Sequence, residues 1–139
     1  MATINENTIR SDIFVNFLKT LKDNLSNPKP KVTNSFTNDA TNFPQIVITL
    51  PKISKTRAKF GSSRNAYLRE GTIDIEVYTK TKKQLSMLID EVDYLLAEHM
   101  DELGIVDFDI GLSNDISFTI EGTNIHSQTL PITLYIGEL

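Results

Sequence analysis

The chain has 139 residues, of which 40% are hydrophobic and 23% are charged, a composition typical of one globular domain. It contains no cysteine, which excludes disulfide scaffolds, thiol nucleophiles and metal sites built on thiolates. The formal net charge of −4 is unevenly distributed, because all 14 basic residues precede residue 84 and the two parts of the sequence carry +7 and −11.

The N-terminal residues lack the basic patch and the apolar block of a signal peptide. The longest apolar runs cover only a few residues, far fewer than the roughly 20 that span a bilayer. We therefore expect no contact with a membrane, and a location in the cytoplasm or in a particle that is assembled there.

The first predicted element is an amphipathic helix over residues 8–25. Its apolar residues recur at steps of three and four: Ile9, Ile13, Phe14, Phe17, Leu18, Leu21 and Leu25. Thr8 can cap its N-terminus, and the helix must end before Pro28, because proline disfavours a helical conformation in the residue before it. Residues 32–43 are rich in Asn, Thr and Ser, which indicates a short extended piece followed by a loop.

Two strands follow, separated by a long polar segment. Residues 45–53 alternate apolar and smaller or polar side chains, although Pro51 should end this strand or place it at a sheet edge. Residues 71–79 alternate more strictly and predict a strand with one dry face. Residues 54–70 between them form a basic connector much longer than a hairpin turn, so we expect a functional loop there.

A second helix and three strands complete the chain. The helix is predicted over residues 81–103, with Gly104 at its C-terminal end, and acidic residues accumulate near that end. Alternating apolar residues then predict strands over 106–112, over 116–120 and around residues 130–136. Short turns between strands favour antiparallel pairing. The sequence thus predicts a single α+β domain over residues 1–139, with two helices packed on one face of a mainly antiparallel sheet.

Residues that could support catalysis or metal binding are few. His99 continues the apolar stripe of the second helix, and His126 has no acidic neighbour in the sequence. The carboxylate pairs Asp107 with Asp109, and Asp74 with Glu76, have the spacing that any half-exposed strand produces. No phosphate-binding glycine motif occurs. We therefore expect no enzyme, no cofactor and no metal.

The strongest candidate for function is a run of basic residues with no acidic residue before Glu70. Its members are Lys52, Lys55, Arg57, Lys59, Arg64 and Arg69. Phe60 and Tyr67 lie among them, a mixture that would suit a nucleic-acid backbone, whereas the overall pI of about 5.1 is unlike that of dedicated binders. A solvated loop or a protein contact is the alternative. The charge-sorted sequence would give the fold two complementary surfaces, unless its parts interleave and their charges cancel.

The order of the elements, together with particular residues, resembles the tail terminator (tail completion) proteins of long-tailed bacteriophages. These are small α+β subunits that form a ring at the head-proximal end of the tail tube. The resemblance covers nearly the whole chain and is carried by the first helix Ile9–Leu25, the run Phe43–Ile48, the run Tyr67–Gly71, the strand Thr72–Tyr78 and the second helix Leu85–Leu96. Head–tail connector and neck proteins share this size and pattern.

The resemblance implies a virion structural protein without catalytic residues. Its copies would form a ring, commonly six in this family, that caps the tail tube protein and offers a docking surface to the head completion or connector protein. DNA would pass through the lumen, and assembly would take place in the host cytoplasm. A closed head-to-tail ring needs two different patches on each subunit. We therefore expect the six basic residues to make assembly contacts or to face DNA in the lumen. A nucleic-acid-binding module that uses residues 52–69 is the main alternative.

Overall fold

The computed structural model describes residues 8–25, 29–38, 43–59 and 65–136, with the backbone alone described for 55–59 and 65–68. The described elements are α1 (Ile9–Asn24), β1 (Lys31–Thr33), β2 (Gln45–Ile48), β3 (Lys52–Lys59), β4 (Asn65–Thr79), α2 (Lys82–Glu98), α3 (Met100–Leu103), β5 (Asp107–Ile110), β6 (Ile116–Ile120) and β7 (Thr123–Ile136). All strands belong to one sheet, in which only β1 and β2 pair in parallel. The predicted α+β class with a mainly antiparallel sheet is confirmed.

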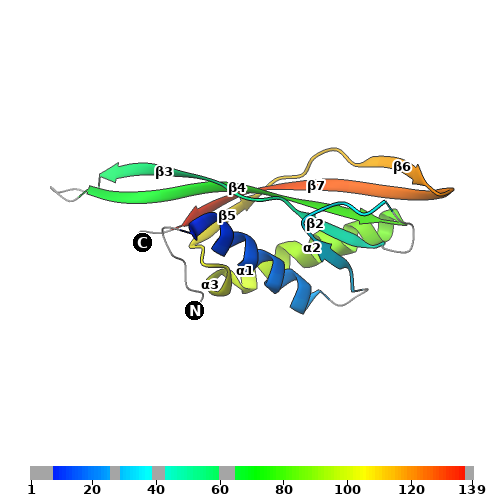
Figure 1. Cartoon of the computed structure of the whole chain (residues 1–139), viewed down its shortest axis with the longest axis horizontal. Helices are drawn as coiled ribbons and strands as arrows, with labels where there is room; N and C mark the ends of the chain where they lie inside the picture. Colours follow the sequence, from blue (N-terminus) through cyan, green and yellow to red (C-terminus); the bar gives the residue numbers. More distant parts are fainter. Residues whose placement is uncertain (1–7, 26–28, 39–42, 60–64, 137–139) are drawn as a thin grey trace.

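The long strands β4 and β7 form the centre of the sheet. They pair from Arg69 opposite Ile136 to Thr79 opposite His126. Along the outer side of β4, β3 pairs with its first half and β2 with its second half, and β1 extends the sheet beyond β2. Along the outer side of β7 lie β5 and β6 (Figure 1). Among the described strands, β1 and β3 therefore form one edge of the sheet, and β5 and β6 form the other.

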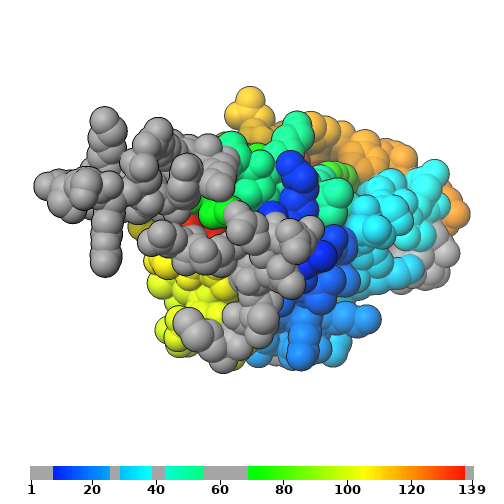
Figure 2. Space-filling model, turned by 60° about the vertical axis from the view of Figure 1, so that its left-hand side comes forward, coloured from blue at the N-terminus to red at the C-terminus, as the bar shows by residue number. Residues whose placement is uncertain are grey.

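The main core lies between the sheet and the helices. Figure 1 shows α1 and α2 on the same side of the sheet. Ile73, Ile75 and Val77 of β4 are buried in one cluster with apolar residues of all three helices, as the alternation in this strand predicts. Asn16 of α1 donates a hydrogen bond to the Leu103 carbonyl of α3 (3.3 Å). Figure 2 shows α1 (blue) between the segment of α3 (yellow) and that of β1 (cyan).

The helix ends agree in part with the prediction. Thr8 occupies the N-cap position, but its hydroxyl donates to Asp12 Oδ2 (2.9 Å) and no backbone N–H bonds to it. The predicted helix over residues 81–103 is divided, because the backbone of His99 (φ −114°, ψ 26°) separates α2 from α3. Gly104 adopts the left-handed conformation (φ 80°) that suits a glycine after a helix.

The prediction of a connector over residues 54–70 is wrong, because β3 and β4 form a hairpin through most of it. The strands pair from Lys52 opposite Thr72 to Lys59 opposite Asn65, and residues 60–64 lie outside the described part. The hairpin extends beyond the helices (Figure 1). A strand at such a place needs no apolar alternation, so the signal that identifies core-facing strands is missing from its sequence.

A second, smaller cluster lies on the face of the sheet away from the helices, here called the outer face. Phe43, Ile120 and Ile125 are buried there against Tyr78 and Phe118. The ring of Phe36, in the loop after β1, lies 4.7 Å from that of Tyr78 between centroids. The buried side chain of Gln45 holds this loop, accepting a hydrogen bond from the Thr37 N–H (3.1 Å) and donating one to the Thr37 carbonyl (3.0 Å).

The turn between β6 and β7 consists of Glu121 and Gly122. Both residues have positive φ angles, 50° and 79°, and Ile120 pairs with Thr123 on either side of them. This is the two-residue turn whose backbone twist matches that of the flanking strands.

Candidate assembly surfaces

The six basic residues predicted to make contacts do not form one exposed patch. Lys52 is exposed at the start of β3. Arg69 is buried, with 6% of its surface accessible, so its side chain has little surface to offer to a partner in the isolated chain. For the other four residues, Lys55, Arg57, Lys59 and Arg64, the structure describes at most the backbone.

Three of those four lie on the backbone of β3. Lys55 is opposite Arg69 in the register, Arg57 is opposite Tyr67, and Lys59 is opposite Asn65. Their side chains, and all of Arg64, lie outside the described part. Because successive residues of a strand alternate between faces, Lys52 belongs to the outer face, whereas Lys55, Arg57 and Lys59 belong to the other face of the hairpin.

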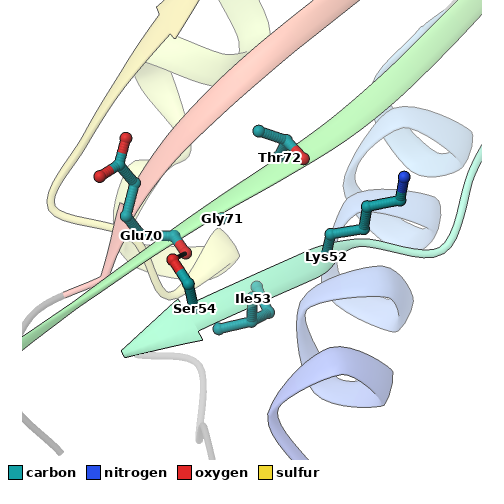
Figure 3. A pocket seen from close by; sticks show the side chains of 6 residues that line it. All are labelled: Lys52, Ile53, Ser54, Glu70, Gly71 and Thr72. Atoms are coloured by element: carbon teal, nitrogen blue, oxygen red, sulfur yellow. Dashed lines mark hydrogen bonds between the residues drawn. The ribbon is translucent and has the colours of Figure 1, made fainter. Parts of the chain in front are cut away.

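An open hollow of about 360 Å³ lies at the base of the hairpin. It is lined by Lys52, Ile53, Ser54, Glu70, Gly71 and Thr72 (Figure 3). A Cβ atom on Gly71 would lie 2.5 Å from Ile53 Cδ1 and 3.0 Å from the Lys52 carbonyl oxygen, so only glycine allows β3 to approach this closely. The Lys52 and Glu70 side chains extend away from each other in Figure 3. Among the lining residues, no charged groups converge as they do in a ligand site.

The outer face is acidic along its centre and at the β5 edge. Glu70, Asp74 and Glu76 alternate on β4, on the face opposite to the buried Ile73 and Ile75. Since Asp107 pairs with Tyr135 and Asp109 with Thr133, both β5 carboxylates belong to this same face. Acidic residues from both parts of the sequence, before and after residue 84, therefore lie on one surface.

Two tyrosines hold carboxylates of the outer face. The Tyr135 hydroxyl donates to Asp109 Oδ2 (3.0 Å), and this hydrogen bond raises the pKa of Tyr135. The Tyr78 hydroxyl donates to Glu76, and burial, together with this bond, raises the pKa of Tyr78. Both phenols therefore remain protonated donors at neutral pH. The sequence alternation places these pairs on one face, but only the strand register brings Tyr135 beside Asp109.

The helix layer presents a second acidic surface. Neither α2 nor α3 has a basic residue in its last turn, whereas Glu98, Asp101 and Glu102 are exposed near these ends. Negative charge at a helix C-terminus opposes the helix dipole and is locally unfavourable. His99 Nδ1 lies 2.9 Å from Glu102 Oε2, so the imidazole and this carboxylate are within hydrogen-bonding distance.

The second histidine takes part in a pair that sequence reasoning missed. Ser117 Oγ lies 2.9 Å from His126 Nδ1, because the β6–β7 register places these two residues opposite each other. The sequence signal for this pair is the nine-residue separation of Ser117 and His126, which spans a short hairpin turn. Nucleophilic catalysis would require a third group to orient the histidine, and among the described residues His126 donates no hydrogen bond to a carboxylate. No group of three or more His, Asp or Glu side chains that could hold a metal occurs among the described residues.

No described helix is long and apolar enough to cross a membrane. Comparison of the sequence with family models and with curated proteins finds no match to either. The basic hairpin, the acidic outer face and the two sheet edges are therefore the features from which a function has to be inferred.

Proposed function

We propose that this chain is a structural protein of a bacteriophage virion, a tail terminator whose copies form a ring at the head-proximal end of the tail. The observation that supports this proposal most strongly is the opposite charge of the two sheet edges. β3, at one edge, contains four basic residues and no acidic residue. β5, at the other edge, contains two acidic residues and no basic residue.

Opposite charges at two edges favour a head-to-tail contact between copies. In such a contact one patch of a subunit meets a different patch of the next, and the chain of contacts closes into a ring when the rotation between subunits permits it. Contacts between identical patches would instead place like charges together, which is unfavourable. The family that the sequence resembles commonly has six copies in its ring.

The ring would act through its surfaces. It would cap the tail tube protein, offer a docking surface to the head completion or connector protein, and let DNA pass through its lumen. Such a subunit needs no reaction centre, cofactor or metal. The same surfaces would also suit another head–tail connector or neck protein, and the position of the protein in the particle distinguishes these roles.

The oligomeric state of the purified full-length chain tests the proposal. Native mass spectrometry should give one discrete multiple of the 15.7 kDa chain, and negative-stain images should show rings. Because exposed charges are screened by salt, the rings should dissociate as the salt concentration rises. A chain that stays monomeric at high concentration and does not join tails would contradict the proposal.

Nucleic-acid binding is a second candidate, favoured by the four basic residues of a hairpin that extends beyond the helices (Figure 1). Generic DNA should then be retained in an electrophoretic shift at low salt, and the affinity should fall steeply with salt concentration. The triple substitution of Arg57, Lys59 and Arg64 by alanine should abolish that shift. DNA binding by a strictly monomeric chain would favour this candidate over the ring.

A further inference from the structure

Lys52 and Asp109 stand at the two ends of one row of residues across the sheet. Lys52 pairs with Thr72, Thr72 with Thr133, and Thr133 with Asp109. All four residues therefore lie on the outer face, and both charged residues at the ends of the row are exposed. Neighbouring strands are about 4.8 Å apart, so the row spans three such spacings from a cation to an anion.

Within the described part of the chain, the strands that carry these two residues are both open on their outer side. Among the described strands, β3 pairs with β4 alone and β5 pairs with β7 alone. Beyond β5, the N–H groups of Gly111 and Ser113 donate to carbonyls of β7 (2.9 and 3.0 Å). Because alternate residues of an antiparallel strand point their backbone groups in opposite directions, those of Ile110 and Leu112 point away from β7. An edge of this kind is a template for another strand.

The strand directions at this end of the sheet suit such an addition. The order across it is β3, β4, β7 and β5, and each neighbouring pair is antiparallel. β3 and β5 therefore run in opposite directions. A second copy, related to the first by rotation about an axis roughly along the strands, would place its β3 antiparallel to the β5 of the first copy.

We propose that the ring is built by this edge pairing, so that β3 of one copy adds to β5 of the next and Lys52 comes beside Asp107 or Asp109. The inference rests on the proposed function, because it specifies the contact between subunits of that ring. The pairing would join the four-stranded ends of successive copies into one continuous antiparallel sheet. Backbone hydrogen bonds would supply affinity, and the charges would select the partner edge.

The charges also explain why the open edges would not pair with themselves. Basic residues on an edge strand normally prevent pairing, since two such strands would bring like charges together. With four basic residues, β3 rejects another β3, and with two acidic residues, β5 rejects another β5. On the outer face, which holds Lys52 of β3 and Asp107 and Asp109 of β5, pairing of β3 with β5 is the one combination of these two strands that brings opposite charges together. The same pattern therefore excludes a two-fold dimer through either strand and permits a head-to-tail ring.

Charge reversal provides a sharp test, because two complementary variants can be mixed. In Lys52→Glu the outer face of both edges carries acidic residues, because Lys52 is the only charged residue of β3 on that face, and in Asp107→Lys/Asp109→Lys the outer face of both edges carries basic ones. Each variant alone should lose assembly by about tenfold or more, since like charges opposite each other on paired strands are destabilising. An equimolar mixture should assemble again, with the two chains alternating around the ring, as native mass spectrometry would show.

Thermal unfolding of each variant checks that the subunit remains folded, which matters because Asp109 accepts a hydrogen bond from Tyr135. If both variants are folded and each assembles alone as well as in the mixture, the edge pairing is wrong.

Cysteine cross-linking gives a second test, in which each variant replaces only one charged residue. The chain has no cysteine of its own, so each introduced thiol is unique. Mixing Lys52→Cys chains with Asp109→Cys or Asp107→Cys chains under oxidising conditions should give a covalent dimer in one of the two mixtures, and the reactive mixture identifies the stagger. Each single variant alone should remain monomeric in denaturing gels.

These outcomes separate the two levels of the proposal. Rings that form in the wild type but show neither cross-link nor charge-swap rescue would overturn the edge pairing and leave the tail terminator proposal standing. A wild-type chain that forms no ring under any condition would overturn the proposed function itself. A Lys52→Cys dimer formed without the second variant would show self-pairing of β3 and would contradict the charge argument.

Discussion

The helix-covered middle of the sheet and the β3–β4 hairpin consist of paired strands, yet different interactions stabilise them. From Ile73 to Val77, alternate side chains of β4 are buried beneath the helices, so apolar burial dominates there. The hairpin extends past the helices, and its first strand is mostly polar and basic (Figure 1). Backbone pairing with β4 holds that strand. We therefore expect substitutions in the middle to destabilise the subunit, and substitutions in the hairpin to affect contacts between copies.

The largest expected effect comes from a cavity in the helix-covered middle. Ile75 is fully buried and lies between Ile48 of β2 and Leu130 of β7 in the register. Ile75→Ala should lower the free energy of unfolding by about 2–5 kcal/mol, because the surrounding residues cannot fully close the space. Urea denaturation followed by circular dichroism measures this loss. The matched control is Thr72→Ala on the exposed face of the same strand, which should change stability by less than about 0.5 kcal/mol. Equal losses in both variants would contradict the comparison.

A smaller loss is expected where β3 packs closely against Gly71 of β4. In Gly71→Ala the new Cβ would lie 2.5 Å from Ile53 Cδ1, so β3 or the Ile53 side chain has to move. Such overpacking costs about 1–3 kcal/mol. The double variant Gly71→Ala/Ile53→Ala removes the close contact and should cost less than the sum of the two single variants, as a double-mutant cycle would measure. Additive losses would show that the two residues are not coupled.

The same contrast explains how much of the fold could be predicted from the sequence. Strong periodicity marks α1, α2 and the middle of β4, because residues such as Leu88 and Ile75 must face one core. For the hairpin the sequence predicts a loop instead, since its strands extend past the helices, where no core imposes a pattern. The break at His99 also gave no signal, because the apolar stripe of α2 continues through Leu103 in α3.

The candidate site was predictable only in part. The excess of basic residues before residue 84 is visible in the sequence, and Lys52, one of the six residues that it singles out, is exposed on the edge strand β3. The sequence could not show that Arg69 is buried or that Lys52 and Asp109 end the same row, because both facts depend on the pairing of strands far apart in the chain. The acidic outer face likewise combines Glu70 with Asp107 only through the register with β7.

A modest effect is expected where a loop crosses the outer face near the helix-covered middle. Gln45 is fully buried, and its amide bonds both to the N–H and to the carbonyl of Thr37. Gln45→Leu keeps the volume but loses both bonds, which should cost roughly 1–2 kcal/mol, since Thr37 is partly exposed and water can replace them. Hydrogen exchange at Thr37 should accelerate in the same variant. Gln45→Glu, which keeps the acceptor for the Thr37 N–H, should protect that amide better than Gln45→Leu. Identical exchange in the two variants would show that the side chain does not hold the loop.

The smallest expected effect is a change in how the free energy of unfolding depends on pH, which should differ between substitutions of Tyr78 and Tyr135 on the outer face. Tyr78 is half-buried among aromatic rings, and burial is the main cause of its raised pKa. For Tyr135, the main cause of the raised pKa is the hydrogen bond to Asp109. A tyrosine whose pKa is raised on folding stabilises the folded chain fully below pH 10.0, its ordinary pKa, and this stabilisation is lost as the pH rises through the folded value. The free energy of unfolding should therefore fall above pH 10, where the unfolded chain releases protons that the folded chain still binds.

Tyr78→Phe should reduce the slope of this fall more than Tyr135→Phe does, because solvent weakens an exposed hydrogen bond but cannot relieve the desolvation of a buried phenol. Denaturation at a series of alkaline pH values measures both slopes, and an unchanged slope in Tyr78→Phe would contradict the burial of that phenol.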